Sequence, residues 1–399
     1  MRKANANTIL AAARGMSAEI VKWRRHIHMN PEPSMGEHDT AAFIADRLRE
    51  IGVDRVTTGV GETGVVGLIR GRGRRTVGLR ADMDALEMEE ANDTPYRSRR
   101  PGLMHACGHD GHVACLLGAA VILNRLKSDL PGSVKLIFQP GEEGAGGAAR
   151  MIKDGVLTAP ALSAMAALHV DTEIPSGKVG IRRGADTAQV DDVMLIVRGK
   201  TSHVARPDTG VDAISAACQA FTAIQQFVAR RTNPLERRLI GFGTINGGTR
   251  MNVVADEVTL HGTIRTIEPE SRKAIIGFLR NDLKKVAGSM GATVQVKIDE
   301  SYPPLVNDDR VVDAVASVAR EMLGPDSLVD IPQPVLGGED FSYYALGGVP
   351  AAMFRIGTLD AKKGFTAAGH NSRFDFDDRR VLPIGAAMLA TTAIRLLEG

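Results

Sequence analysis

Short apolar runs alternate with segments of helical periodicity along the first part of the chain. Residues 64–69, 134–138 and 164–170 have the length and apolar character of buried strands. Residues 39–51 and 111–126 carry apolar side chains at helical spacing. Strands that alternate with helices favour a sheet covered by helices. The pattern therefore predicts an α/β fold class for this part of the chain.

The middle of the chain has a different order of elements. The sequence predicts strand 190–197, helix 211–229, strands 239–245 and 258–264, helix 269–287 and strand 293–298. This β-α-β-β-α-β order is that of the split ferredoxin-like unit. Since α/β alternation resumes afterwards, we predict a larger mixed-sheet domain over residues 1–186 and 301–399. A small ferredoxin-like domain over residues 187–300 is inserted into it.

Composition narrows the classes of partner and compartment. The chain has 49 basic and 47 acidic residues in 399, so no basic footprint indicates nucleic acid or an anionic membrane. No apolar run approaches the roughly 18 residues that a membrane span needs. Three cysteines in so long a chain are no disulfide framework. We expect a cytoplasmic protein that binds neither nucleic acid nor membrane.

One glycine pattern imitates a cofactor site. Residues 59–64 read Gly-Val-Gly-Glu-Thr-Gly, which matches the dinucleotide-binding fingerprint. That fingerprint needs a helix after the glycines, whereas residues 65–69 have the apolar character of a strand. The pattern therefore predicts a hairpin turn.

Metal-ligating residue types gather next to the predicted strands. The candidates are Cys107 in the run 105–112 (His-Ala-Cys-Gly-His-Asp-Gly-His), the pair Glu142 and Glu143, His169 and His370. Thiolate, imidazole and carboxylate together suit Zn²⁺ or another first-row divalent ion. The set exceeds one tetrahedral site and fits two ions that share a ligand. Such a pair activates a water molecule, and of two adjacent glutamates one ligates while the other takes the proton.

Each candidate taken alone has a plainer interpretation. Cys107 could be a buried thiol, His169 a satisfied core histidine, and the paired glutamates a solvated turn. We predict Cys115 and Cys218 to be core residues. We also predict surface or packing roles for the remaining isolated histidines, which are His26, His28, His38 and His261.

Four motifs occur together in one order. They are 79–86 (Leu-Arg-Ala-Asp-Met-Asp-Ala-Leu), 105–112, 138–144 (Phe-Gln-Pro-Gly-Glu-Glu-Gly) and 337–342 (Gly-Gly-Glu-Asp-Phe-Ser). They closely resemble the dinuclear metallo-amidohydrolases that include hippurate hydrolases, N-acyl-amino-acid amidohydrolases and auxin-conjugate hydrolases. These enzymes belong to the aminoacylase and zinc-carboxypeptidase clan. The resemblance covers nearly the whole chain.

The resemblance implies a role for each site residue. It implies two divalent ions, Mn²⁺ or Zn²⁺, and a metallopeptidase-like catalytic domain. Glu142 would be the general base, and Asp82 and Asp84 would orient a ligating imidazole. The implied metal ligands are Cys107, which bridges the ions, His109, Glu143, His169 and His370.

The resemblance also gives the inserted domain a role. It implies a lid/dimerisation domain of a homodimer, in which His203 enters the partner's active site. Asn252 and Arg265 match substrate-binding positions. Arg250 places a cation where relatives often carry a small residue, and Gly141 stands where they frequently carry Ala. We therefore expect a small carboxylate-bearing substrate whose identity differs from the common one.

Three functions remain at this point. The first is hydrolysis of a C–N bond, namely the amide of an N-acyl or N-aroyl amino acid, with metal-bound hydroxide as the nucleophile. The second is hydrolytic deamination of a carboxylated aromatic amine at the same site. The third is a non-catalytic metal- or ligand-binding protein, against which an unligated second glutamate, Glu142, argues.

Overall fold

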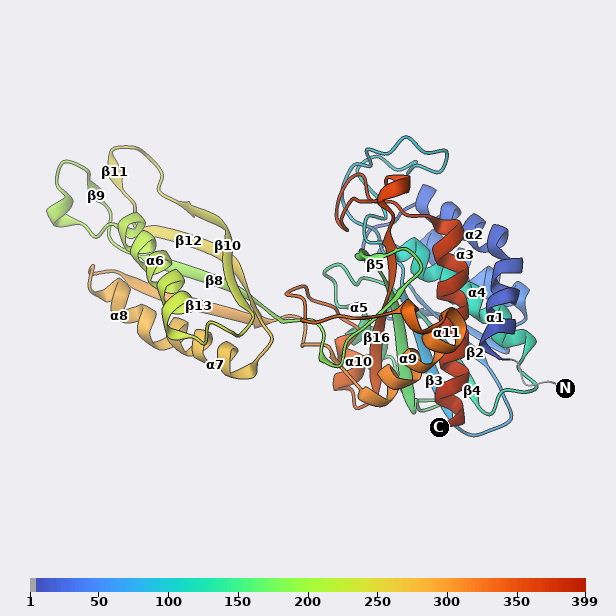
Figure 1. Cartoon of the computed structure of the whole chain (residues 1–399). Helices are drawn as coiled ribbons and strands as arrows, with labels where there is room; N and C mark the ends of the chain where they lie inside the picture. The colour runs from blue at the N-terminus through green and yellow to red at the C-terminus, as the bar shows by residue number, and fades with distance from the viewer. Residues whose placement is uncertain (1–4) are drawn as a thin grey trace. The chain divides into compact units, whose positions relative to one another are not determined.

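The computed structural model describes residues 5–399 and divides them into two compact units (Figure 1). The larger unit takes the described residues up to Asp186, then Val306–Gln333 and Asp340–Gly399. The inserted unit is Thr187–Leu305 together with Pro334–Glu339. The short return segment 334–339 is a feature that the sequence pattern did not indicate.

The larger unit is built on an eight-stranded mixed sheet. Its order is β1-β2-β4-β3-β5-β16-β6-β15, and β4, β3, β5 and β16 run parallel. These strands are buried because helices cover them, which explains their continuous apolar character. The strands are β1 Arg55–Val60, β2 Gly64–Ile69, β3 Thr76–Asp82, β4 Ser133–Gln139, β5 Ala164–Pro175, β6 Val179–Ile181, β15 Leu328–Asp330 and β16 Ala351–Leu359, beside a separate pair, β7 Gly184–Ala185 and β14 Val306–Asn307.

Helices of this unit pack on one another and on the sheet. The α-helices are α1 Ala6–Gly15, α2 Ser17–Met29, α3 His38–Ile51, α4 His109–Arg125, α5 Gly147–Lys153, α9 Asp309–Leu323, α10 Ser342–Leu346 and α11 Asp378–Glu398. α4 lies against α2, α11 and β3, so it is buried almost all round. Among the described residues, α11 alone is long and apolar enough to cross a membrane, but 78% of its apolar window is buried inside the fold, as in a core helix.

The inserted unit has the β-α-β-β-α-β order that the sequence predicts. Its sheet has the antiparallel order β10-β12-β8-β13, which is the ferredoxin-like arrangement. Its elements are β8 Gln189–Arg198, α6 Ala213–Arg231, β10 Arg238–Gly247, β12 Glu257–Thr266, α7 Pro269–Gly277, a π-helical turn Phe278–Asp282, α8 Leu283–Gly288 and β13 Thr293–Glu300. A small ladder joins β9 Ser202–His203 to β11 Val253–Val254. The predicted fold class is confirmed.

Two local predictions have opposite outcomes. Residues 59–64 contain the end of β1, the turn 61–63 and the start of the antiparallel strand β2, so the hairpin is confirmed. Cys115 is buried as expected, but the prediction of a buried Cys218 is wrong, because this thiol is exposed on α6. Ala216, Ala217 and Ala220 form the buried face of α6, and the helical rotation turns Cys218 away from it.

Candidate metal centre

The segment before α4 turns sharply at a glycine between two candidate ligands. Gly108 has a φ of +90°, and a Cβ there would come within 2.5 Å of Cγ2 of Val170. Only glycine satisfies both the left-handed backbone and this close approach. The turn places Cys107 just before the helix and His109 at its first residue.

The five predicted ligands fall into two groups that share one thiol. Cys107 forms one group with His109 and His169 and another with Glu143 and His370, and within each group the ligand atoms lie within 4.8 Å of one another. Sγ of Cys107 is 3.5 Å from Nε2 of His169. Oε1 of Glu143 is 3.4 Å from Nε2 of His370 and 3.8 Å from Nε2 of His109. The structure thus brings together five residues from four segments of the chain.

Two buried atoms of this cluster lack a hydrogen-bond partner among the described residues. They are Nε2 of His109 and Oε1 of Glu143. Nδ1 of His109 is 2.9 Å from the carbonyl oxygen of Asp84, so in the neutral ring the proton lies on Nδ1 and Nε2 is left as the acceptor on the side of Glu143. A buried acceptor without a donor costs about 1–3 kcal/mol. A cation between these acceptors removes that cost, so the residues present fit the two divalent ions that the resemblance implies.

Burial keeps two of the donors uncharged. Burial raises the pKa of the Cys107 thiol to about 12. Burial and the neighbouring His112 lower the pKa of His169 well below its usual range. The contact with the Glu143 carboxylate, whose Oε1 is 3.4 Å from Nε2 of His370, raises the pKa of His370. Since a thiol ligates as the thiolate, binding of a cation at Cys107 must release a proton.

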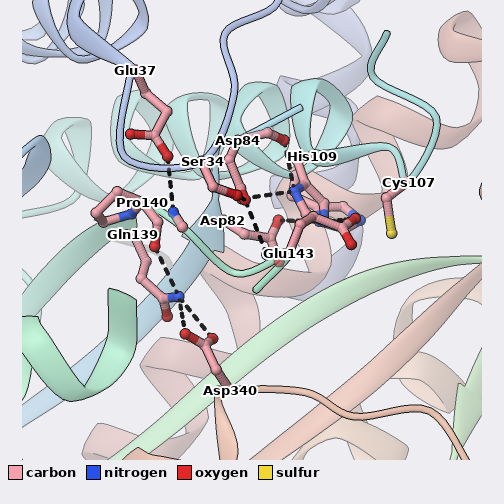
Figure 2. Close-up of polar contacts among 12 residues, drawn as sticks. Ser34, Glu37, Asp82, Asp84, Cys107, His109, Gln139, Pro140, Glu143 and Asp340 are labelled. Atoms are coloured by element: carbon pink, nitrogen blue, oxygen red, sulfur yellow. Dashed lines mark hydrogen bonds and ion pairs between the residues drawn. The ribbon is translucent and has the colours of Figure 1, made fainter. Parts of the chain in front are cut away.

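Asp84 holds two candidate ligands at once (Figure 2). Its Oδ1 is 3.2 Å from Nδ1 of His109, and its Oδ2 accepts the backbone N–H of Glu143 at 3.0 Å. Ser34 donates its hydroxyl to Oδ2 as well. Asp82 instead pairs with Arg80 and with Nδ1 of His112. Asp84 therefore contacts the imidazole of His109 through its carbonyl oxygen and Oδ1, and it holds the main chain of Glu143 through Oδ2.

His112 has a supporting position that the sequence reasoning did not assign. Its Nδ1 is 2.5 Å from Oδ1 of Asp82, and its Nε2 accepts the backbone N–H of Val170 at 3.0 Å. Both ring nitrogens are engaged, so His112 braces β5 beside His169 rather than offering a ligand. Its spacing of three residues from His109 on one helix was the signal available.

Glu142 lies beside the cluster without belonging to either Cys107 group. Its side chain is buried, and a carboxylate oxygen lies within 4.8 Å of ligand atoms of His109 and Glu143. It stands in the loop after β4, on the same turn as Glu143. A buried carboxylate at this position can take up or release a proton.

The remaining predicted residues belong to the inserted unit. His203 is on β9, and its Nδ1 accepts the backbone N–H of Ala205. Arg250 and Asn252 are exposed in the segment before β11, and Arg265 is half-buried on β12. Because they lie in the other unit, their roles at the metal centre stay predictions.

Comparison with known proteins agrees with this description. Thermostable carboxypeptidase 2 of Saccharolobus solfataricus is 39% identical over 381 residues, which cover 94% of this chain and 95% of that protein. N-acetyl-L-cysteine deacetylase of Bacillus subtilis is 36% identical over 384 residues, with 96% and 89% covered. The crystal structure of the YXEP protein of Bacillus subtilis, described as a dinuclear metal binding peptidase from the M20 family, has a TM-score of 0.83 at 30% identity, with 96% and 99% covered.

The family assignment rests on most of the chain. The family model described as peptidase family M20/M25/M40 matches residues 78–395, a span that contains all five candidate ligands and Glu142. The resemblance predicted from the four motifs is confirmed. This hydrolase is a member of peptidase family M20/M25/M40.

Proposed function

We propose that the protein hydrolyses the amide bond of an N-acyl amino acid, and that Glu142 is the general base. The observation that carries this proposal is the pair of ligand groups that share Cys107, with the carboxylate of Glu142 beside them. The deacetylase and the carboxypeptidase among the similar proteins support it. Both names describe an amide whose nitrogen belongs to an amino acid.

The chain's own residues supply the proton transfers. Two divalent ions held by Cys107, His109, Glu143, His169 and His370 would polarise the substrate carbonyl and acidify a water molecule. Glu142 receives the water's proton on a carboxylate oxygen as the C–O bond forms. It then delivers that proton to the amide nitrogen as the C–N bond breaks. Asp84 keeps His109 and Glu143 in place throughout, because its carboxylate contacts both residues.

We further propose that the inserted unit docks on a second copy of the chain. Among residues 5–399, nine of the eleven large apolar side chains that are exposed lie in this unit. Concentrations of exposed apolar side chains mark interaction surfaces. They are Val204, Ile214, Phe221, Leu235, Leu239, Ile245, Met251, Met290 and Val335. A homodimer would cover them and carry His203 to the partner's site.

In this proposal the inserted unit also recognises the substrate carboxylate. Arg265 and Arg250 supply guanidinium groups, which bind carboxylates through paired N–H donors. Asn252 supplies a neutral donor and acceptor. Each of these groups suits the free carboxylate of an amino acid.

A substrate panel tests the reaction. Protein loaded with Mn²⁺ or Zn²⁺ is mixed with N-acetyl and N-benzoyl amino acids and with aminobenzoates, and products are identified by mass spectrometry. We expect free amino acid and the released acid, with Glu142→Gln as the inactive, metallated control. Release of ammonia from an aminobenzoate alone favours the deaminase. Turnover of no amide by fully metallated protein contradicts the proposal.

A further inference from the structure

The loop that carries Glu142 and Glu143 has little rigidity of its own. It connects β4 to α5 and contains Gly141, Gly144 and Gly146, and Gly147 is the first residue of α5. Three of these glycines have positive φ values. Glycine-rich backbone has the largest conformational freedom to lose on folding. The loop has two backbone hydrogen bonds of its own, from the N–H of Gly144 to the carbonyl of Glu142 and from the N–H of Gly147 to the carbonyl of Gly141. Contacts from other parts of the fold add to these bonds and help to hold the carboxylates in position.

Glu37 holds the loop immediately before Glu142. This fully buried carboxylate precedes α3, and its Oε1 accepts the backbone N–H of Gly141 at 2.8 Å (Figure 2). The same oxygen accepts the N–H of Met35 at 2.9 Å, and Oε2 accepts the hydroxyl of Thr63 at 2.6 Å. One side chain thus joins the α3 entry, the β1–β2 turn and the loop.

Two further carboxylates hold the rest of the loop. Oδ2 of Asp84 accepts the N–H of Glu143. At the two ends of the loop, Asp340 accepts from Nε2 of Gln139 at 2.7 Å and from the N–H of Ala148 at 2.9 Å. Of these hydrogen bonds, the one to Glu37 holds the N–H of the Pro140–Gly141 peptide. This peptide lies directly before Glu142 in the chain.

We propose that Glu37 is a positioning residue for the hydrolytic reaction, because it fixes the Gly141 peptide and thereby the carboxylate of Glu142. The proposal rests on the proposed role of Glu142. Rotation of the Pro140–Gly141 peptide would swing Glu142 as a whole, because Gly141 offers no side chain to resist it. A displacement of about 1 Å in such a group costs up to about 100-fold in rate.

The hydrogen bonds can be separated from the charge of Glu37. In Glu37→Gln the amide oxygen still accepts both backbone N–H groups. The amide NH₂ then donates to Thr63, whose hydroxyl can act as an acceptor. Glu37→Ala removes every bond, and Glu37→Asp is too short to reach Gly141 and Thr63 together. Thr63→Val removes one bond of Glu37 and leaves the bond to Gly141.

The test measures kcat, KM, metal content and amide hydrogen exchange of residues 139–148. Exchange is measured in the metal-free and the loaded protein. For Glu37→Ala and Glu37→Asp we expect kcat to fall by about 10- to 100-fold, with KM and metal content within about twofold. Loop exchange should accelerate in both forms. Glu37→Gln and Thr63→Val should stay within about threefold of wild-type kcat.

Three results overturn the proposal. One is accelerated loop exchange without loss of kcat, and another is unchanged exchange in both Glu37→Ala and Glu37→Asp. The third is a Glu37→Gln variant as slow as Glu37→Ala, which would assign the effect to charge. If Glu37→Ala does not fold, Glu37→Asp and Glu37→Gln still give the comparison. If wild-type protein hydrolyses no amide but the amide exchange of the loop still depends on Glu37, the proposed function is wrong. The structural role of Glu37 in holding the loop is then still supported.

Discussion

Two adjacent glutamates, Glu142 and Glu143, both lie near His109 but differ in their relation to Cys107. Glu143 lies near His109 and His370 in the Cys107 cluster, whereas Glu142 belongs to neither Cys107 group. We expect Glu142→Gln to retain metal and lose about 10²–10⁴ in kcat, the usual contribution of a positioned base. Glu143→Gln, the matched control, should lose metal itself. Elemental analysis and kcat on the same preparations check both, and normal turnover of metallated Glu142→Gln would exclude this base.

A substitution at Gly141 tests how tightly the loop packs against Met35. Its φ is +60°, and a Cβ there would lie 2.6 Å from Sδ of Met35. Gly141→Ala should therefore destabilise this protein by about 1–3 kcal/mol. Gly102→Ala is the control, since Gly102 has a φ of +75° with open space around it.

The comparison isolates the clash with Met35. We expect the free energy of unfolding, measured in urea, to fall further for Gly141→Ala than for Gly102→Ala. Met35→Ala should remove most of that excess when combined with Gly141→Ala, because it deletes the sulfur that the new Cβ meets. Equal losses in the two glycine variants would mean that the contact is relieved by a small shift.

The candidate ligands at strand ends could be predicted from the sequence, but the residues that hold these ligands in place could not. A thiol, a carboxylate or an imidazole can be recognised from the sequence as a possible metal ligand, as at Cys107, Glu143 and His169. Glu37 looks ordinary in the sequence, and His112 stands in the 105–112 motif without a distinct role, because the importance of both comes from backbone N–H groups of distant segments. Such contacts exist only after the sheet and its loops are assembled.

At the scale of elements, helix α2 places charged side chains in the core of the larger unit. Arg24 is fully buried and bonds Asp110 of α4 at 2.8 Å and Asp375 before α11 at 2.8 Å. His28, one turn further on, is also buried, with Nδ1 2.8 Å from Asp110 and Nε2 3.4 Å from Glu90. Buried charges are tolerated only in such paired networks. The sequence predicts a surface or packing role for His28. In the structure His28 is buried and takes part in this ionic network.

This network makes stability depend on pH. Burial alone would lower the pKa of His28, but the Asp110 carboxylate and hydrogen bonds to Asp110 and Glu90 raise it to about 9, against the opposing charge of Arg24. A pKa raised on folding gives stability that is complete below about pH 6.5 and lost as pH rises through about 9. A shift of this size corresponds to about 3 kcal/mol.

The change in stability between pH 6.5 and 9.5 should therefore differ between wild type and His28→Gln. Urea unfolding at several pH values should show wild type losing about 3 kcal/mol more than the variant over this interval. His26→Gln is the control on the same helix, because burial lowers the pKa of His26, the opposite direction to the shift of His28. Parallel curves for wild type and His28→Gln would contradict the ionic role.

Element positions were predictable where periodicity was strong. The predicted helix 39–51 is α3 within one residue, and the predicted strand 64–69 is β2 without change. The predicted strand 164–170 continues to Pro175 as β5, because pairing with β16 holds polar residues that periodicity assigns to a loop. The charged residues of α2 are of a type that is usually exposed to solvent. No sequence pattern indicates that their ionic partners lie in α4 and before α11.

At the scale of the whole molecule, the candidate residues divide between two units. Glu142 and the five ligands lie in the larger unit, while His203 is exposed on β9 of the inserted unit. The proposed homodimer lets each site take His203 from the partner, where it would donate a hydrogen bond to the oxyanion of the tetrahedral intermediate. A two-fold axis makes this exchange reciprocal.

Complementation between two inactive variants tests the exchange. Glu142→Ala and His203→Ala are co-expressed with different tags, and mixed dimers are purified through both tags. One site of the mixed dimer then lacks both groups, while the other has Glu142 from its own chain and His203 from the partner. We expect about half of wild-type activity, because one of two sites works. If His203 acts within its own subunit, neither site has both groups, so an inactive mixed dimer whose parents are folded and metallated would disprove the exchange.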